Sequence, residues 1–208
     1  FKELLSDSQP VHQLEHLTIV PGPNTAPDDP KLTALAATVL QTTLRTYPEV
    51  DYLVLGMPEF RQWAGMCELA WQELDSKYGI NQVRSLDEIL SAASKRPGIP
   101  SARALAEAQG DIVILRFYDR LFTECQALSA EQLSDTKFIY KAVAEELFPI
   151  LARVLPPGSE TLNFLAYTPA RVVKRREAIG RLDTEKIPAA LVFTLHDDNI
   201  GLLPALTT

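Results

Sequence analysis

Apolar and polar residues alternate along the chain in patterns that predict strands joined by helices. The continuous apolar run 52–55 is typical of a strand covered on both faces. Before it, at 32–44, leucine, valine and alanine recur every three or four residues, which predicts a helix that begins at Pro30. A strand is expected at 16–20. The segment 16–55 therefore has about the length of one strand–helix–strand crossover unit.

The middle of the chain predicts helices almost throughout. Two capping boxes, Ser85 with Glu88 and Ser129 with Gln132, mark helix starts. Residues 112–115 are β-branched enough for a strand, although a helix is preferred there. Pro149 is expected to kink the last helix, and the aromatic residues between 117 and 148 are expected in the core. The predicted helices are 60–78, 85–95, 101–125 and 129–155.

Two further strands, at 162–167 and 190–195, begin about 28 residues apart, again one crossover unit. The fold class expected is α/β, with parallel strands and crossover helices: a partial TIM (β/α)8 barrel. Residues 1–208 would form one barrel-type domain, with 60–157 as a helical insertion. Four strands cannot close an eight-stranded barrel, so the other strands belong to a longer protein or the sheet is open and doubly wound.

Composition narrows the classes of protein and partner. Hydrophobic residues make up 46% and charged residues 23% of the chain, which is typical of a globular domain. A net charge of −7 argues against nucleic acid as a partner. No apolar run approaches the roughly 20 residues that span a membrane. The start at Phe1, inside a helix-like stretch, indicates a fragment; its compartment stays open, with a secreted or periplasmic location compatible.

The two cysteines, Cys67 and Cys125, lie in predicted helices, and both are expected to be buried thiols. Neither belongs to a CxxC pair or a Cys/His cluster, so no zinc site is predicted. No GxGxxG or GxxxxGK[ST] motif follows the first strand, which removes the usual nucleotide-binding versions of the fold. No cofactor and no metal ion are therefore expected.

Acidic residues follow two of the four predicted strands, where α/β folds collect their functional groups. Glu59 comes directly after the strand at 52–55, and Arg61 and Trp63 are close enough in sequence to bind or stack on a substrate. Glu59 is a candidate general acid or nucleophile. The alternative is that it caps the following helix, where the dipole favours a carboxylate.

A second group of polar residues follows the last strand. Asp197 and Asp198 are candidate catalytic acids, and His196 and Asn199 are candidate substrate contacts. Tyr167, at the end of the strand before, is a further candidate sugar contact. The alternatives are an Asx-type turn for the aspartates and simple hydrogen-bonded packing for the histidine.

Two carboxylates from different strand ends suit glycoside hydrolysis, in which one protonates the leaving oxygen while the other attacks or activates water. They also suit a hard metal ion such as Mg²⁺.

The segments 52–63 and 196–204 resemble the barrel domains of large glycosidases, most of all the α-glucuronidase group, with β-hexosaminidase-like barrels behind it. In those barrels an apolar strand ends in an acid before an aromatic-bearing helix, and a later strand ends in an acidic turn. Here Ile200 interrupts that turn, and His196 replaces a frequent tryptophan. The resemblance implies sugar-binding acids at Glu59 and at Asp197 or Asp198.

The function expected is that of a glycosidase fragment with a carbohydrate substrate. One alternative is a metal-dependent hydrolase or lyase that uses His196, Asp197 and Asp198. The other is a non-catalytic interaction module formed by the helices at 85–155.

Overall fold

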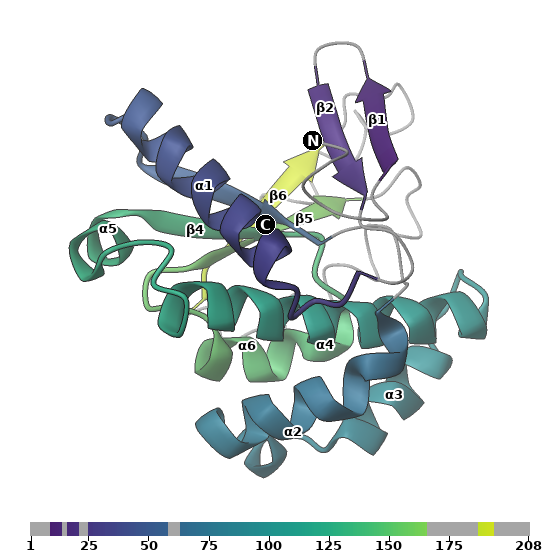
Figure 1. The fold of residues 1–208 in the computed structure, drawn as a ribbon. Coiled ribbons are helices and arrows are strands. Elements are labelled where there is room, and N and C mark those ends of the chain that lie inside the picture. Colours follow the sequence, from purple (N-terminus) through teal and green to yellow (C-terminus); the bar gives the residue numbers. More distant parts are fainter. Residues whose placement is uncertain (1–8, 14–15, 21–24, 58–62, 166–186, 194–208) are drawn as a thin grey trace.

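The computed structural model of the chain describes residues 9–13, 16–20, 25–57, 63–165 and 187–193. Its centre is a four-stranded sheet in the order β3-β4-β5-β6, with every neighbouring pair parallel (Figure 1). The strands are β3 (Tyr52–Gly56), β4 (Lys137–Lys141), β5 (Glu160–Leu165) and β6 (Ala189–Phe193). The strands predicted at 52–55, 162–167 and 190–195 are thereby confirmed; residues 166–167 and 194–195 of the last two lie outside the described residues.

The partial TIM barrel predicted from the sequence is wrong. Within the described residues the parallel sheet is small and open, since β3 and β6 are its two edges and do not pair with each other. Helices make up most of the remainder. Closing a barrel requires about eight tilted strands, which these four strands do not supply. The described part is a mixed α/β fold in which helices outweigh the sheet.

The first predicted crossover unit is also wrong. Strand β2 (His16–Val20) pairs antiparallel with β1 (Gln9–Gln13), and Pro10 lies opposite Ile19 in this hairpin. Only two residues separate the two strands in sequence, so the local pairing closes a very short loop. The hairpin forms a sheet of its own and does not join the parallel sheet.

Strand β4 lies where the sequence predicted a continuous helix over 129–155. Helix α5 (Ala130–Asp135) ends before it, and α6 (Phe148–Val154) begins after it. In β4 the aromatic side chains of Phe138 and Tyr140 are two residues apart, so both point to the same buried face. Pro149 does not kink a helix but lies in the first turn of α6, where the missing N–H is harmless.

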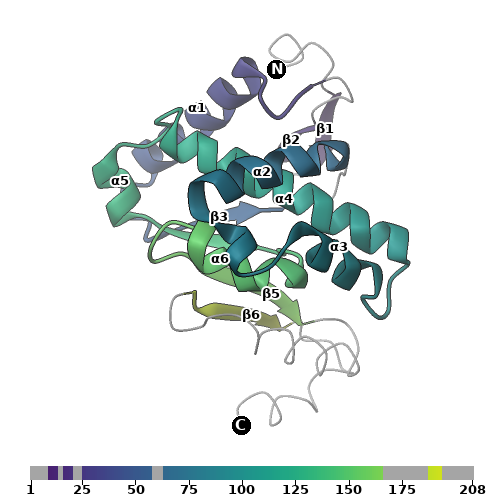
Figure 2. The same ribbon diagram turned by 90° about the horizontal axis from the view of Figure 1, so that it is seen from below.

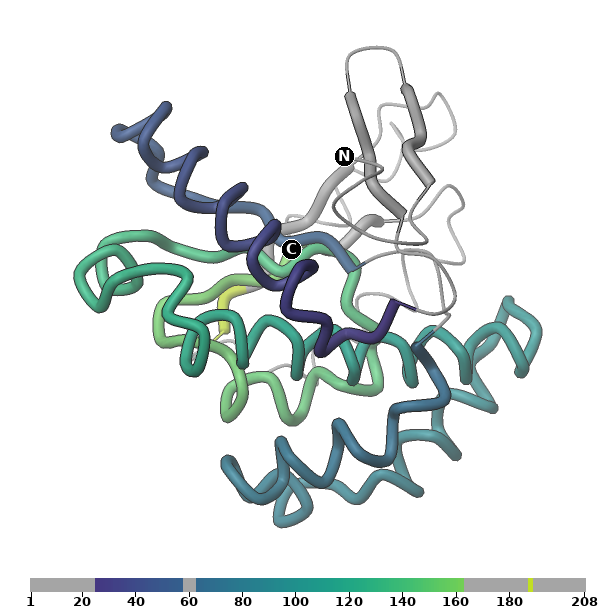
Figure 3. Tube along the Cα trace, viewed as in Figure 1, coloured from purple at the N-terminus to yellow at the C-terminus, as the bar shows by residue number. Residues whose placement is uncertain are grey.

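The helices lie in two layers on one face of the sheet. Helices α4 (Ser101–Thr123) and α6 lie next to it, and α2 (Cys67–Tyr78) and α3 (Leu86–Ser94) pack on the far side of α4 (Figures 1 and 2). The trace in Figure 3 follows the chain through both layers between β3 and β4. No helix of the described part is long and apolar enough to cross a membrane. The remaining helical segments are α1 (Pro30–Thr46), η1 (Ala64–Met66), η2 (Ile80–Gln82) and η3 (Glu145–Leu147).

Local sequence signals set the helix ends. Both predicted capping boxes are present, at Ser85–Glu88 and Ser129–Gln132. The side chain of Asp29 caps α1, because it accepts a hydrogen bond from the Lys31 N–H at 2.8 Å. Gly79 ends α2 in the left-handed conformation, at a φ of +62° that a side chain would strain. These ends agree with the sequence because capping depends on residues close along the chain.

One face of the parallel sheet carries the hydrophobic core. Leu55 of β3, Tyr140 of β4 and Thr161 of β5 are neighbours in the register and are all buried. On the opposite face, Val54 is 54% exposed beside Ile139. The helices therefore cover one face of the sheet, and the alternation of side chains along each strand separates the two faces.

The two cysteines differ, contrary to the expectation that both are buried. Cys67 is buried at the start of α2, whereas Cys125 is exposed just after α4; both thiols are free. Burial, and secondarily the charge of Glu68, raises the pKa of the Cys67 thiol to about 11. Since the thiolate is the nucleophile, Cys67 is a poor one at pH 8.

Iodoacetamide at pH 8 is therefore expected to alkylate Cys125 and to leave Cys67 unmodified in the folded chain. Peptide mass spectrometry measures both sites, and the chain unfolded in guanidinium chloride is the control in which both react. Alkylation of Cys67 at the rate of Cys125 in the folded chain would contradict this assignment.

Candidate functional site

The carboxyl ends of the four parallel strands form one rim of the sheet. The backbone hydrogen bonds between strands continue just past the ends of β3 and β4. The Met57 N–H donates to the Lys141 carbonyl oxygen at 3.1 Å, and the Ala142 N–H donates to the Leu162 carbonyl oxygen at 3.0 Å. The ends of β3 and β4 are therefore level, whereas β5 continues three residues further, to Leu165, and pairs there with the end of β6. In open α/β sheets this rim is where ligands bind.

Helix α4 fixes the end of β3 at this rim. The Tyr118 hydroxyl donates to the Gly56 carbonyl oxygen at 2.9 Å, and the Tyr118 ring packs edge-on against Tyr140 at 5.9 Å between centroids. Burial raises the pKa of Tyr118 to about 12, so its hydroxyl stays protonated and can donate at neutral pH. The residues that follow Gly56 therefore start from a fixed point.

A buried carboxylate fixes the turn after β4. Asp111 of α4 is almost fully buried, and its carboxylate oxygen accepts a hydrogen bond from the Ala144 N–H at 2.8 Å. Ala142 adopts a φ of +66°, which is uncommon for a residue with a side chain. The chain thus turns sharply at the rim and is held there by a buried hydrogen bond from the backbone to a side chain of α4.

The turn after β4 brings two charged residues to the rim that the sequence analysis missed. Lys141 ends the strand and Glu145 follows four residues later, and both side chains are partly exposed. They were missed because β4 was taken for part of a helix. The spacing of Phe138 and Tyr140 by two residues was the signal that could have revealed the strand.

Most of the predicted site residues lie outside the described residues. These are Glu59, Arg61, Tyr167, His196, Asp197, Asp198 and Asn199. In sequence, Glu59 comes three residues after the end of β3, and Asp197 four residues after the end of β6. Their roles, and whether they meet, remain predictions.

Trp63 is the one predicted site residue that the structure describes. It is buried, its indole N–H donates to the Thr25 carbonyl oxygen at 2.7 Å, and its ring lies 6.3 Å from that of Phe117. The ring is thus part of the packing between the 25–29 segment and α4.

Within the described part of the chain, no three His, Cys, Asp or Glu residues are placed to hold a metal ion. Comparisons with protein families, with curated proteins and with solved structures found no match to this chain. The likeness of residues 52–63 and 196–204 to glycosidases therefore stays a prediction, whereas the barrel that it implied is wrong.

Proposed function

We propose that the chain belongs to a carbohydrate-active hydrolase, a glycosidase, in which Glu59 and either Asp197 or Asp198 form the pair of catalytic carboxylates. The observation that carries the proposal is the common direction of all four strands. Strands that run parallel point their carboxyl ends to the same rim. Acids that follow these ends in sequence therefore start from one side of the sheet.

The distance between the strand ends sets what the loops must do. Strands β3 and β6 are three steps apart in the sheet, or about 14 Å at roughly 4.8 Å a step, and β6 ends three residues further along than β3 does. Glycosidases need their carboxylates about 5 to 9.5 Å apart. The short connections from β3 to Glu59 and from β6 to Asp197 must therefore carry both acids inward, over the ends of β4 and β5.

The rim offers further groups for a sugar. Lys141 and Glu145 stand at the end of β4, between the starting points of the two acids. Charged side chains beside a catalytic pair hold sugar hydroxyls and shift the pKa values of the acids toward their separate roles. The division of roles, one carboxylate protonated as acid and the other ionised, follows from unequal surroundings of this kind.

Hydrolysis of a panel of p-nitrophenyl glycosides by the complete protein tests the proposal. We expect release of p-nitrophenol from at least one sugar, at the same rate with and without EDTA, because carboxylates perform both steps. No turnover of any glycoside would contradict the proposal. Loss of activity in EDTA that Mg²⁺ restores would favour a metal-dependent hydrolase instead.

A further inference from the structure

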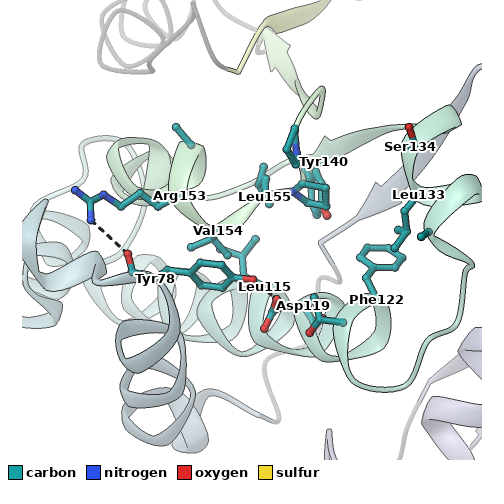
Figure 4. Close-up of a pocket in the computed structure, with 15 residues that line it drawn as sticks. Tyr78, Leu115, Asp119, Phe122, Leu133, Ser134, Tyr140, Arg153, Val154 and Leu155 are labelled. Carbon is teal, nitrogen blue, oxygen red and sulfur yellow. Dashed lines mark hydrogen bonds between the residues drawn. The ribbon is translucent and has the colours of Figure 1, made fainter.

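A second candidate binding site lies on the helical face of the sheet. It is a pocket of about 670 Å³, where α5 leads into β4 and α6 leads toward β5 (Figure 4). Its volume falls within the range of about 300 to 1,000 Å³ that is common for small-molecule sites. Its walls are largely apolar and include Leu115, Phe122, Leu133, Val154 and Leu155.

Both charged residues at this pocket already have hydrogen-bond partners in the protein. Asp119 accepts hydrogen bonds from the Tyr78 hydroxyl and from Lys77 Nζ, which lies 2.9 Å from both carboxylate oxygens. The Arg153 guanidinium donates to the carbonyl oxygens of Tyr78 and Gly79 at 3.3 and 3.1 Å. Both charged residues are committed to protein partners, so the pocket favours a neutral guest.

Tyr140 lines the pocket with a buried hydroxyl. The residue is 1% exposed, and its hydroxyl makes no hydrogen bond to any other residue that the structure describes. Burial, followed by the charges of Tyr118, Asp119 and Tyr78, raises the pKa of Tyr140, so it remains a donor. A buried hydroxyl without a partner is unfavourable, and an oxygen atom of a guest would supply one.

We propose that this pocket binds a small, neutral, mostly apolar molecule that places a hydroxyl or carbonyl oxygen against the hydroxyl of Tyr140. The apolar walls would take up the hydrocarbon body, and Tyr140 would select guests that carry the oxygen. The site is distinct from the rim proposed for sugar chemistry, because it lies on the helical face of the sheet and most of its lining comes from helices and from the segments that lead into β4 and β5. Either proposal can fail without the other.

Binding of 2-naphthol to the complete chain, measured by calorimetry, tests this inference, with naphthalene as the matched guest that lacks the oxygen. We expect saturable binding of both. Tyr140→Phe should weaken 2-naphthol about fivefold and leave naphthalene within twofold, since only one hydrogen bond is lost. This variant removes a hydroxyl without a described partner, so the fold should survive.

Ser134→Trp provides a second variant, because Ser134 is exposed and lines the pocket. The larger ring should fill the entrance and weaken both guests at least tenfold. Absence of saturable binding would overturn the inference, as would equal effects of Tyr140→Phe on both guests. Unchanged binding in Ser134→Trp would overturn it too, because the guests would then lie elsewhere.

Discussion

Replacement of Glu59 by glutamine is expected to slow glycoside hydrolysis by about 10²- to 10⁴-fold, the usual contribution of a general acid or base. Glutamine keeps the size of the side chain but can neither lose nor supply the proton that the reaction needs. The loss should fall on kcat rather than on KM, because the proton moves only in the transition state. Initial rates on the best p-nitrophenyl glycoside measure it.

Glu49 offers a matched control for this variant. It precedes β3 by three residues, as Glu59 follows it by three, and its side chain is exposed. Glu49→Gln makes the same chemical change at the other rim of the same strand and should leave the rate within twofold. Equal activity of the Glu59→Gln and Glu49→Gln proteins would remove Glu59 from the mechanism.

Replacement of Arg96 by methionine is expected to lower the free energy of unfolding by about 3–5 kcal/mol, as when one partner of a buried ion pair is removed. Arg96 holds Glu146 through two hydrogen bonds, from Nε at 2.9 Å and Nη2 at 2.5 Å, and Glu107 through Nη1 at 2.7 Å. The side chains of Arg96 and Glu146 are only 9% and 5% exposed. Without the arginine, Glu146 would be a buried and unpaired charge.

Burial alone would lower the pKa of Arg96, but the hydrogen bonds and charge of Glu146, with the charge of Glu107, raise it on balance. The cation is therefore a stable part of the link between α3, α4 and η3. Urea unfolding followed by circular dichroism measures the loss.

Arg103 is the control, because it pairs with the same Glu107 at 3.1 Å but is 72% exposed. Arg103→Met should cost no more than about 0.5 kcal/mol, as expected for an exposed pair on one helix. The double variant Arg96→Met with Glu146→Gln should regain much of the loss, because no charge is left buried. Equal losses for the Arg96→Met and Arg103→Met proteins would contradict this account.

Elements specified by residues close in sequence were predicted well. The two capping boxes, the start of α1 at Pro30 and the stop at Gly79 all depend on neighbours within a few residues. The helix at 112–115 is confirmed against the strand that its β-branched residues also favour. All four residues of this run are part of α4 and are buried. Tertiary packing therefore outweighs their local β preference.

Elements specified by pairing with distant partners were predicted less well. Strand β4 lies between β5 and β3, and β3 is far from it in sequence. The strand has only five residues, which is too short to show a clear period of two. The sequence also predicted a barrel because parallel strands with crossovers occur in barrels and open sheets alike. The pattern of apolar residues does not indicate whether a sheet stays open or closes into a barrel.

The rim and the pocket differ in how far they could be predicted. Glu59 and Asp197 could be proposed because they follow clear strands, and they stay predictions, whereas Lys141 and Glu145 were missed along with β4. The pocket near Tyr140 is built by side chains from five helices and strands, so no short motif marks it. Only the spatial arrangement brings those residues together.

The contacts of Arg153 have a consequence for how tightly a guest could be held. Through this side chain, α6 is hydrogen-bonded to the carbonyl oxygens of Tyr78, the last residue of α2, and of Gly79, which caps that helix. Two walls of the cavity are thereby tied to one another before anything enters. The pocket would therefore be preorganised for a molecule that fits, and little binding free energy would be lost in ordering the protein.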